Sequence, residues 1–308
     1  MPGFYELTSA LKLTSKGTGG SNSARYCYSV WLRHLVMAHE SGLPTQPKVI
    51  AELGPGDSLG VGLAALLSGA EKCFALDVLE YASTQVNLDI LDELVTMFAQ
   101  KEPIPGPQEF PRVKPFLQSY EFPSHILSDD RLRQTLNPGR VEAIKSALIN
   151  FNNPDKSPIE VSYFVPWSDA GVIKEQSVDM IFSQAVLEHV GDLPHTYKAL
   201  YRWLKADGFM SHKIDFSSHG RAMHWNGHWA YSELTWRLMK GKSLYLLNRE
   251  PYSTHHRLMQ KSGFEIVHRV RVTDTSGITR KQLSSRFYNM SDDDLKTRGV
   301  YVVARKRP

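Results

Sequence analysis

The 308-residue sequence contains only two cysteines, Cys27 and Cys73. So few thiols exclude a fold held together by several disulfides. Cys73 also lies within an apolar run that predicts a buried strand, which disfavours its pairing with Cys27. This cysteine usage is typical of a reducing compartment, and we expect the protein to be cytoplasmic.

Long hydrophobic runs are also absent, although 42% of the residues are hydrophobic. No apolar stretch approaches the roughly 20 residues of a membrane-spanning helix, so no membrane span is expected. The first six residues, MPGFYE, lack the basic and then apolar pattern of a secretory signal. The length allows a substantial core, and we expect one elaborated domain.

The charge balance shows only a small basic excess, with a formal net charge of +4. Proteins that bind nucleic acids usually concentrate many more basic residues in one patch. The composition therefore disfavours a nucleic-acid partner, and the short basic tail at 304–308 does not change that expectation. Oligomeric state is not indicated by any feature of the sequence.

The most informative stretch is 49–60, which reads VIAELGPGDSLG. A short apolar run predicts a buried strand, and the residues from Leu59 onward predict a helix, so Gly54 and Gly56 form a tight turn between them. Glycines let the backbone approach a ligand closely, and the first amides of the helix face that ligand. Leu59 replaces the third glycine of the dinucleotide-binding motif, which disfavours a pyrophosphate ligand.

Two acidic residues narrow the choice of ligand. Glu52 directly precedes the first glycine, where a carboxylate repels phosphate but suits an ammonium or sulfonium group. Asp77 ends a second predicted strand, in the position of an acid that accepts hydrogen bonds from both hydroxyls of a ribose. The alternative is an ordinary turn between strand and helix, with Asp77 as a solvated strand end.

These residues resemble the first two motifs of the class I S-adenosylmethionine-dependent methyltransferases. The matching residues are ELGPGDS at 52–58 and Asp77, and SVDMIFSQAVLEHV at 177–190 is similar to the family's fourth-strand motif. The combination, in order and at plausible spacing, is more specific than a glycine turn alone. The resemblance implies an α/β fold with a seven-stranded, mostly parallel, doubly wound sheet, and S-adenosyl-L-methionine as the cofactor.

The resemblance also implies which residues contact the cofactor. We expect the methionine end at the glycine turn, the ribose at Asp77 and the sulfonium near the end of the fourth strand. Where the family commonly has an adenine-binding Asp, this chain has Trp167-Ser168-Asp169; Trp167 could stack on the base, Asp169 could bond its amine, or backbone alone could serve. The expected cofactor-binding residues are Glu52, Gly54, Gly56, Ser58, Asp77, Val78, Trp167, Ser183 and Gln184.

Histidines concentrate between positions 212 and 228, together with tryptophan and asparagine. His224 and His228 have the spacing of metal ligands on a helix, but the residues between them are poor helix formers. A polar loop whose histidines bond to backbone groups is a second alternative. We favour a third, an active site in which one histidine is the general base, with no metal. The catalytic candidates are His212, His219, His224 and His228, and the expected substrate contacts are His189, Trp225, Asn226 and Arg249.

The predicted organisation is a methyltransferase domain at 49–308 preceded by a helical segment, 1–48, that closes over the cofactor. Six prolines between 103 and 123 exclude a long regular element there. We expect 101–158 to form an ordered cap and 216–250 to form a substrate loop.

The predicted activity is transfer of a methyl group from S-adenosylmethionine to an oxygen or nitrogen of a polar small molecule or glycan. A nucleic-acid methyltransferase is the alternative among enzymes. A module that binds the cofactor without catalysis is the alternative from another class.

Overall fold

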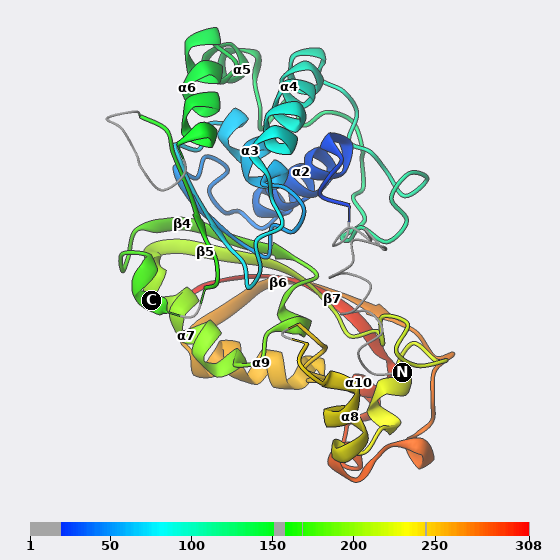
Figure 1. Cartoon of the computed structure of the whole chain (residues 1–308). Coiled ribbons are helices and arrows are strands. Elements are labelled where there is room, and N and C mark those ends of the chain that lie inside the picture. Colours follow the sequence, from blue (N-terminus) through cyan, green and yellow to red (C-terminus); the bar gives the residue numbers. More distant parts are fainter. Residues whose placement is uncertain (1–19, 151–157, 168, 244, 308) are drawn as a thin grey trace.

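A computed structural model of the chain describes residues 20–150, 158–167, 169–243 and 245–307. A seven-stranded sheet in the order β3-β2-β1-β4-β5-β7-β6 forms its centre (Figure 1). The strands are β1 (Val49–Leu53), β2 (Lys72–Leu76), β3 (Glu160–Phe164), β4 (Val178–Gln184), β5 (Leu204–Asp215), β6 (Phe264–Thr273) and β7 (Thr297–Lys306). Strands β1 to β5 are parallel, and β7 runs antiparallel to both β5 and β6. The mostly parallel, doubly wound sheet of the class I methyltransferases is therefore confirmed.

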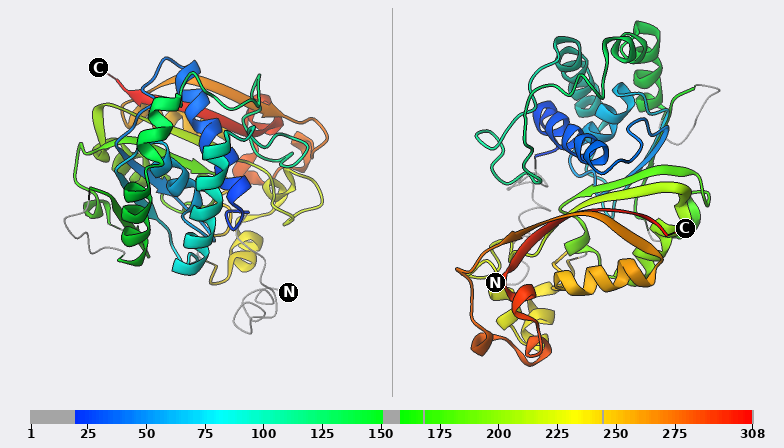
Figure 2. Two further views of the ribbon diagram at one scale, coloured as in Figure 1. Left: turned by 90° about the horizontal axis from the view of Figure 1, so that it is seen from above. Right: turned by 180° about the vertical axis from the view of Figure 1, so that it is seen from behind.

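One face of the sheet is covered by the helices of the first half of the chain (Figures 1 and 2). These are α2 (Ala24–Glu40), α3 (Gly60–Leu67), α4 (Thr84–Gln100), α5 (Asp129–Thr135) and α6 (Pro138–Ile149). Helix α3 has the sequence GVGLAALL and is buried at every residue, since it lies between the sheet and its neighbouring helices. Its position directly after β1 fixes the glycine turn at the carboxyl edge of the parallel strands.

The other face is covered by α7 (Leu193–Trp203) and α9 (Tyr252–Lys261) (Figure 1). Asp192 caps α7 by accepting a hydrogen bond from the His195 amide at 2.9 Å. The helix buries large side chains such as Trp203 against the sheet. Two shorter helices, α8 (Glu233–Lys240) and α10 (Asp292–Lys296), extend the molecule beyond this layer.

The proline-rich part of the expected cap is anchored by the buried guanidinium of Arg33 on α2. Arg33 donates hydrogen bonds to the carbonyl oxygens of Pro105, Val113 and Pro115 at 3.0, 3.2 and 2.5 Å. A chain without regular secondary structure is thus held by one side chain that satisfies several of its carbonyls. Residues 1–19 lie outside the described residues, so closure of the N-terminal segment over the cofactor stays a prediction.

Two elements differ from what the local sequence indicates. Ala206-Asp207-Gly208 is typical of a helix end and predicts a turn, but strand β5 begins at Leu204. Leu204 pairs with Val178, and the register shifts before Met180 pairs with Phe209. Helix α10 was not expected, because a five-residue helix has too little periodicity to detect.

Among the described residues, no helix has the length and apolar character needed to span a membrane.

Candidate functional site

The turn after β1 requires glycine at its first position. Gly54 has φ +61° and Gly56 φ +76°, both in the left-handed region. A Cβ on Gly54 would lie 2.6 Å from Cγ2 of Val186, which follows β4. The backbone of the turn therefore packs directly against the segment after β4, at the edge where ligands bind in open α/β sheets.

Asp77 follows β2 and lies across from the glycine turn. Its Oδ2 accepts a hydrogen bond from the Gly56 amide at 3.3 Å, and its Oδ1 accepts one from the Val78 amide at 2.7 Å. Burial raises the pKa of Asp77, while these amide bonds oppose that effect. The carboxyl group is thus held between the first two strand ends, as an acid that binds a ribose must be.

Glu52 is near the same turn but faces inward. It is only 4% exposed, and its Oε2 accepts a hydrogen bond from the Gly62 amide of α3 at 3.2 Å. Burial raises its pKa to about 8, and the nearby Asp77 adds to the shift. We expected a carboxylate facing the cofactor's amine; the structure instead has Glu52 bonding the first turn of α3 behind the glycines.

The residues around the turn fit the S-adenosylmethionine that the resemblance implies. Asp77 would hold the ribose hydroxyls, and the backbone at Gly54 and Gly56 would hold the methionine end. The fit depends on space as well as on charge, because a side chain at Gly54 would fill the space next to Val186. When bound, the cofactor supplies an electrophilic methyl group on a sulfonium.

Other expected cofactor residues have internal partners. Ser58 is buried and donates to the carbonyl of Ser21. Ser183 is also buried, with its Oγ 2.8 Å from Nδ1 of His212. Trp167 packs against Trp203 at 5.3 Å between ring centroids, and its Nε1 donates to the Asp169 carbonyl at 3.1 Å.

The two remaining expected cofactor residues are less enclosed. Val78 is 38% exposed beside Asp77. Gln184 is half-buried at the end of β4, and its Nε2 donates to the carbonyl of Lys114 at 3.5 Å. The segment that contains Lys114 therefore reaches the end of β4, beside the expected position of the sulfonium.

A cluster of polar side chains lies at the ends of β4 and β5. Glu188 and His189 follow β4, and His219 lies in the turn after β5. His219 Nε2 is 3.9 Å from Glu188 Oε1 and also 3.9 Å from Asp215 Oδ1. The rings of His189 and His219 meet edge to face at 5.1 Å, and Lys213 donates to Asp215 at 2.8 Å.

The protonation states in this cluster follow from burial and from Lys213. Burial raises the pKa of Glu188 to about 8 and lowers that of His189 to about 4. Burial also lowers the pKa of His219, although Asp215 opposes this. Burial alone would raise the pKa of Asp215, but the charge and hydrogen bond of Lys213 hold it well below its usual range.

Of the four histidines expected to be catalytic, the structure brings only His219 into this cluster. His212 is wholly inside the sheet, bonded to Ser183. His228 is buried with its ring 4.8 Å from that of Trp229. His224 is an exposed residue of the loop after β5.

The residues expected to contact the substrate also do not all lie in this cluster. His189 belongs to the cluster, and its Nδ1 donates to the Tyr245 carbonyl at 2.7 Å. Asn226 is buried, where it accepts from the Ile278 amide at 2.6 Å and donates to the Leu295 carbonyl at 3.2 Å. Arg249 donates to Glu233 and lies over the Trp236 ring, while Trp225 packs against Trp229. Asn226, Arg249 and Trp225 thus join parts of the fold to one another.

Sequence reasoning missed two tyrosines that connect the two ends of the site. Burial raises the pKa of Tyr81, and a hydrogen bond with Tyr245 and the charges of Asp77 and Asp57 add to the effect. Tyr245 also bonds His189 through its carbonyl. No motif in the sequence marks these tyrosines as part of the site.

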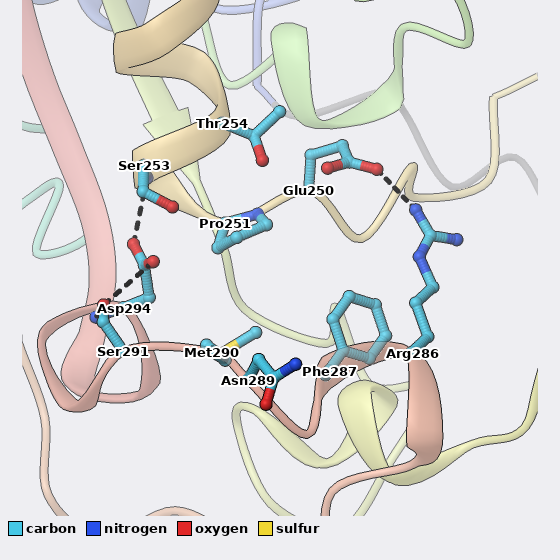
Figure 3. A pocket seen from close by; sticks show the side chains of 10 residues that line it. All are labelled: Glu250, Pro251, Ser253, Thr254, Arg286, Phe287, Asn289, Met290, Ser291 and Asp294. Carbon is cyan, nitrogen blue, oxygen red and sulfur yellow. Dashed lines mark hydrogen bonds and ion pairs between the residues drawn. The ribbon is translucent and has the colours of Figure 1, made fainter.

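A separate hollow of about 380 Å³ lies where α9 begins (Figure 3). It is lined by Glu250, Pro251, Ser253, Thr254, Arg286, Phe287, Asn289, Met290, Ser291 and Asp294. Its charged groups pair within its wall. Arg286 donates to Glu250, and Asp294 accepts hydrogen bonds from the Ser253 amide and the Ser291 hydroxyl. Because these polar groups pair with one another, we assign them a structural role.

Comparison with known proteins matches residues 153–211 to the methyltransferase domain family. No curated protein matches the chain. Similar solved structures include an S-adenosylmethionine-dependent methyltransferase from Mesorhizobium loti, with 14% identity, 89% of this chain and 98% of that chain covered, and a TM-score of 0.42. A methyltransferase from Methanosarcina mazei has 12% identity, coverage of 88% and 96%, and a TM-score of 0.41. Phosphoethanolamine N-methyltransferase 2 from Haemonchus contortus, in complex with S-adenosyl-L-methionine, has 14% identity, coverage of 90% and 53%, and a TM-score of 0.43.

The matched residues contain β3, β4, α7 and the first part of β5, with the site's fourth-strand motif. The strand order and the antiparallel β7 agree with this family, and Asp77 lies beside the glycine turn, where its Oδ2 accepts a hydrogen bond from the Gly56 amide. Residues 153–211 thus match the methyltransferase domain family, and the strand order agrees with the fold of the class I S-adenosylmethionine-dependent methyltransferases.

Proposed function

We propose that the acceptor of this methyltransferase is a polar small molecule or glycan, methylated on oxygen or nitrogen at the ends of β4 and β5. The observation that carries the proposal is the cluster of Glu188, His189, Asp215 and His219. Glu188 is 3% exposed, and polar groups are enclosed to this extent where a polar partner or ligand compensates for the lost water. An apolar acceptor would leave these groups without such compensation.

Methyl transfer from a sulfonium needs alignment of the acceptor with the bond that breaks, exclusion of water and loss of the acceptor's proton. The cluster follows β4 directly, and β4 is paired with the strand that leads to the glycine turn. This supports an acceptor placed beside the methyl group. We assign the loss of its proton to His219, because it alone among the four candidate histidines lies in the cluster, next to Asp215.

The test is to incubate the protein with methyl-labelled S-adenosylmethionine and fractionated polar metabolites, and then to identify the labelled product. We expect label in a hydroxyl- or amine-bearing compound. His219→Ala should reduce turnover more than a hundredfold, within the range of proton-transfer catalysis, while cofactor affinity is kept. The exposed His195→Ala is the matched control. Label found only in nucleic acid, or full turnover by His219→Ala, would contradict the proposal.

A further inference from the structure

The cluster has a second property that proton removal does not explain. One ligand atom each from Glu188, His189 and His219 can be chosen so that all three lie within 4.8 Å of one another. Two imidazoles and one carboxylate are the donors that divalent transition metals such as Zn²⁺, Mn²⁺ or Fe²⁺ accept. We propose that these three residues bind one divalent transition-metal ion.

Glu188 is the strongest single observation. Among the residues that the structure describes, neither of its carboxylate oxygens has a hydrogen-bond partner of good geometry, although the backbone amides of Glu188 and Asp215 lie near enough to favour its charged form. A buried carboxyl group without such partners is costly. A cation between Glu188 and the two imidazoles would remove that cost.

His189 is oriented as a metal-binding histidine is. Its Nδ1 donates to the Tyr245 carbonyl at 2.7 Å, so in the neutral ring Nε2 carries the lone pair. A backbone carbonyl on the far nitrogen commonly fixes the tautomer and the ring direction of a metal ligand.

His219 completes the set from the turn after β5. It has φ +48°, a left-handed conformation that is strained for a residue with a side chain. Ligand atoms around a zinc ion lie about 3.5 Å apart, so the 4.8 Å spacing closes with small rotations of this partly exposed ring. The charge of Lys213 opposes a metal ion here, but its bond to Asp215 offsets that charge.

This inference rests on the proposed function and changes how His219 acts: as a metal ligand it would promote loss of the acceptor's proton through the metal ion, without taking the proton itself. A metal with three protein ligands keeps open positions for substrate. The acceptor's oxygen would bind there, its hydroxyl proton would pass to solvent, and the oxygen would then attack the methyl carbon while the carbon–sulfur bond breaks. The products are the methylated acceptor and S-adenosylhomocysteine. The acceptor therefore belongs to the metal-chelating polar compounds, with an oxygen beside the methylated atom.

The experiment begins with the full chain stripped of metal by a chelator and dialysed. Zn²⁺ is titrated by calorimetry, and Co²⁺ by its visible absorption. We expect one equivalent per chain. Glu188→Gln and His219→Ala should each weaken binding at least tenfold, while the nearby exposed His224→Ala keeps it. Because His219 is exposed, its variant tests the site even where Glu188→Gln fails to fold.

Absence of a stoichiometric site for both ions, or wild-type affinity in His219→Ala, would overturn the metal site. S-adenosylmethionine binding is measured on the same stripped preparations. Cofactor binding without metal binding would refute the metal site alone. Loss of turnover to labelled product on stripping, with cofactor binding retained and turnover restored by added metal, would support it.

Discussion

Replacing His34 with glutamine should make the protein's stability less sensitive to acid. His34 is 1% exposed, and burial lowers its pKa to about 3. Its Nδ1 is 2.7 Å from the Ser211 hydroxyl and 3.2 Å from that of Tyr301. In the unfolded chain the ring takes up a proton below about pH 6.5, whereas in the folded chain it stays neutral down to about pH 3.

The sign and size of the pH effect follow from this difference in the pKa of His34 between the unfolded and folded chains. The contribution of His34 is fully present above pH 6.5 and is lost as the pH falls toward 3, because the unfolded state then binds the extra proton. At pH 5 the loss is about 2 kcal/mol, from 1.5 pH units at about 1.4 kcal/mol each. Glu52, with its pKa raised by burial to about 8, changes stability in the opposite direction over this range. The useful quantity is therefore the difference in free energy of unfolding between variant and wild type.

Urea unfolding followed by tryptophan fluorescence at pH 8 and pH 5 gives that quantity. The free-energy gap between wild type and His34→Gln should shrink by about 2 kcal/mol at pH 5. The exposed His195→Gln serves as the control for loss of a histidine as such. A gap that stays constant to within about 0.5 kcal/mol would show that His34 is not held neutral, and the reasoning would fail.

Further predictions concern the turn and the cap. Gly54→Ala should weaken S-adenosylmethionine binding more than about tenfold, since a left-handed alanine costs roughly 1–2 kcal/mol and its Cβ meets Val186. Adding Val186→Ala to this variant should recover part of the lost affinity. Calorimetry measures both affinities. Arg33→Met should lower the free energy of unfolding by about 3 kcal/mol, because it leaves several buried carbonyls without a donor. Arg25→Met should cost under about 1 kcal/mol, because its ion pairs with Glu102 and Glu109 are exposed. Equal urea midpoints for the two arginine variants would contradict the anchoring role of Arg33.

The sequence was most informative where local physics decides the structure. An apolar run, two glycines and an apolar helix predicted β1, its turn and α3, because strand burial and left-handed glycines are local requirements. The placement of Asp77 opposite the turn followed from parallel strands ending at one edge. The motif at 177–190, which contains Glu188 and His189, likewise forms β4 and the segment that follows it.

Side-chain direction and long-range partners could not be predicted in the same way. Glu52 turns inward because α3 offers it the Gly62 amide. Asn226 looked like a substrate contact, but its partners Ile278 and Leu295 lie about fifty to seventy residues away, where no local pattern reveals them. The position of Tyr245 over the site likewise depends on how a loop folds back, which hydrophobic periodicity does not encode.

The most direct test of the central claim is calorimetric titration of the chain with S-adenosylmethionine. The account predicts micromolar-scale binding by the wild type. Asp77→Ala should weaken it about a hundredfold, since two charge-assisted hydrogen bonds of roughly 1.5 kcal/mol each are lost. The exposed Glu80→Ala, in the same segment, should bind as the wild type does. Absence of binding by the wild type, or equal affinity in the folded Asp77→Ala variant, would contradict the account.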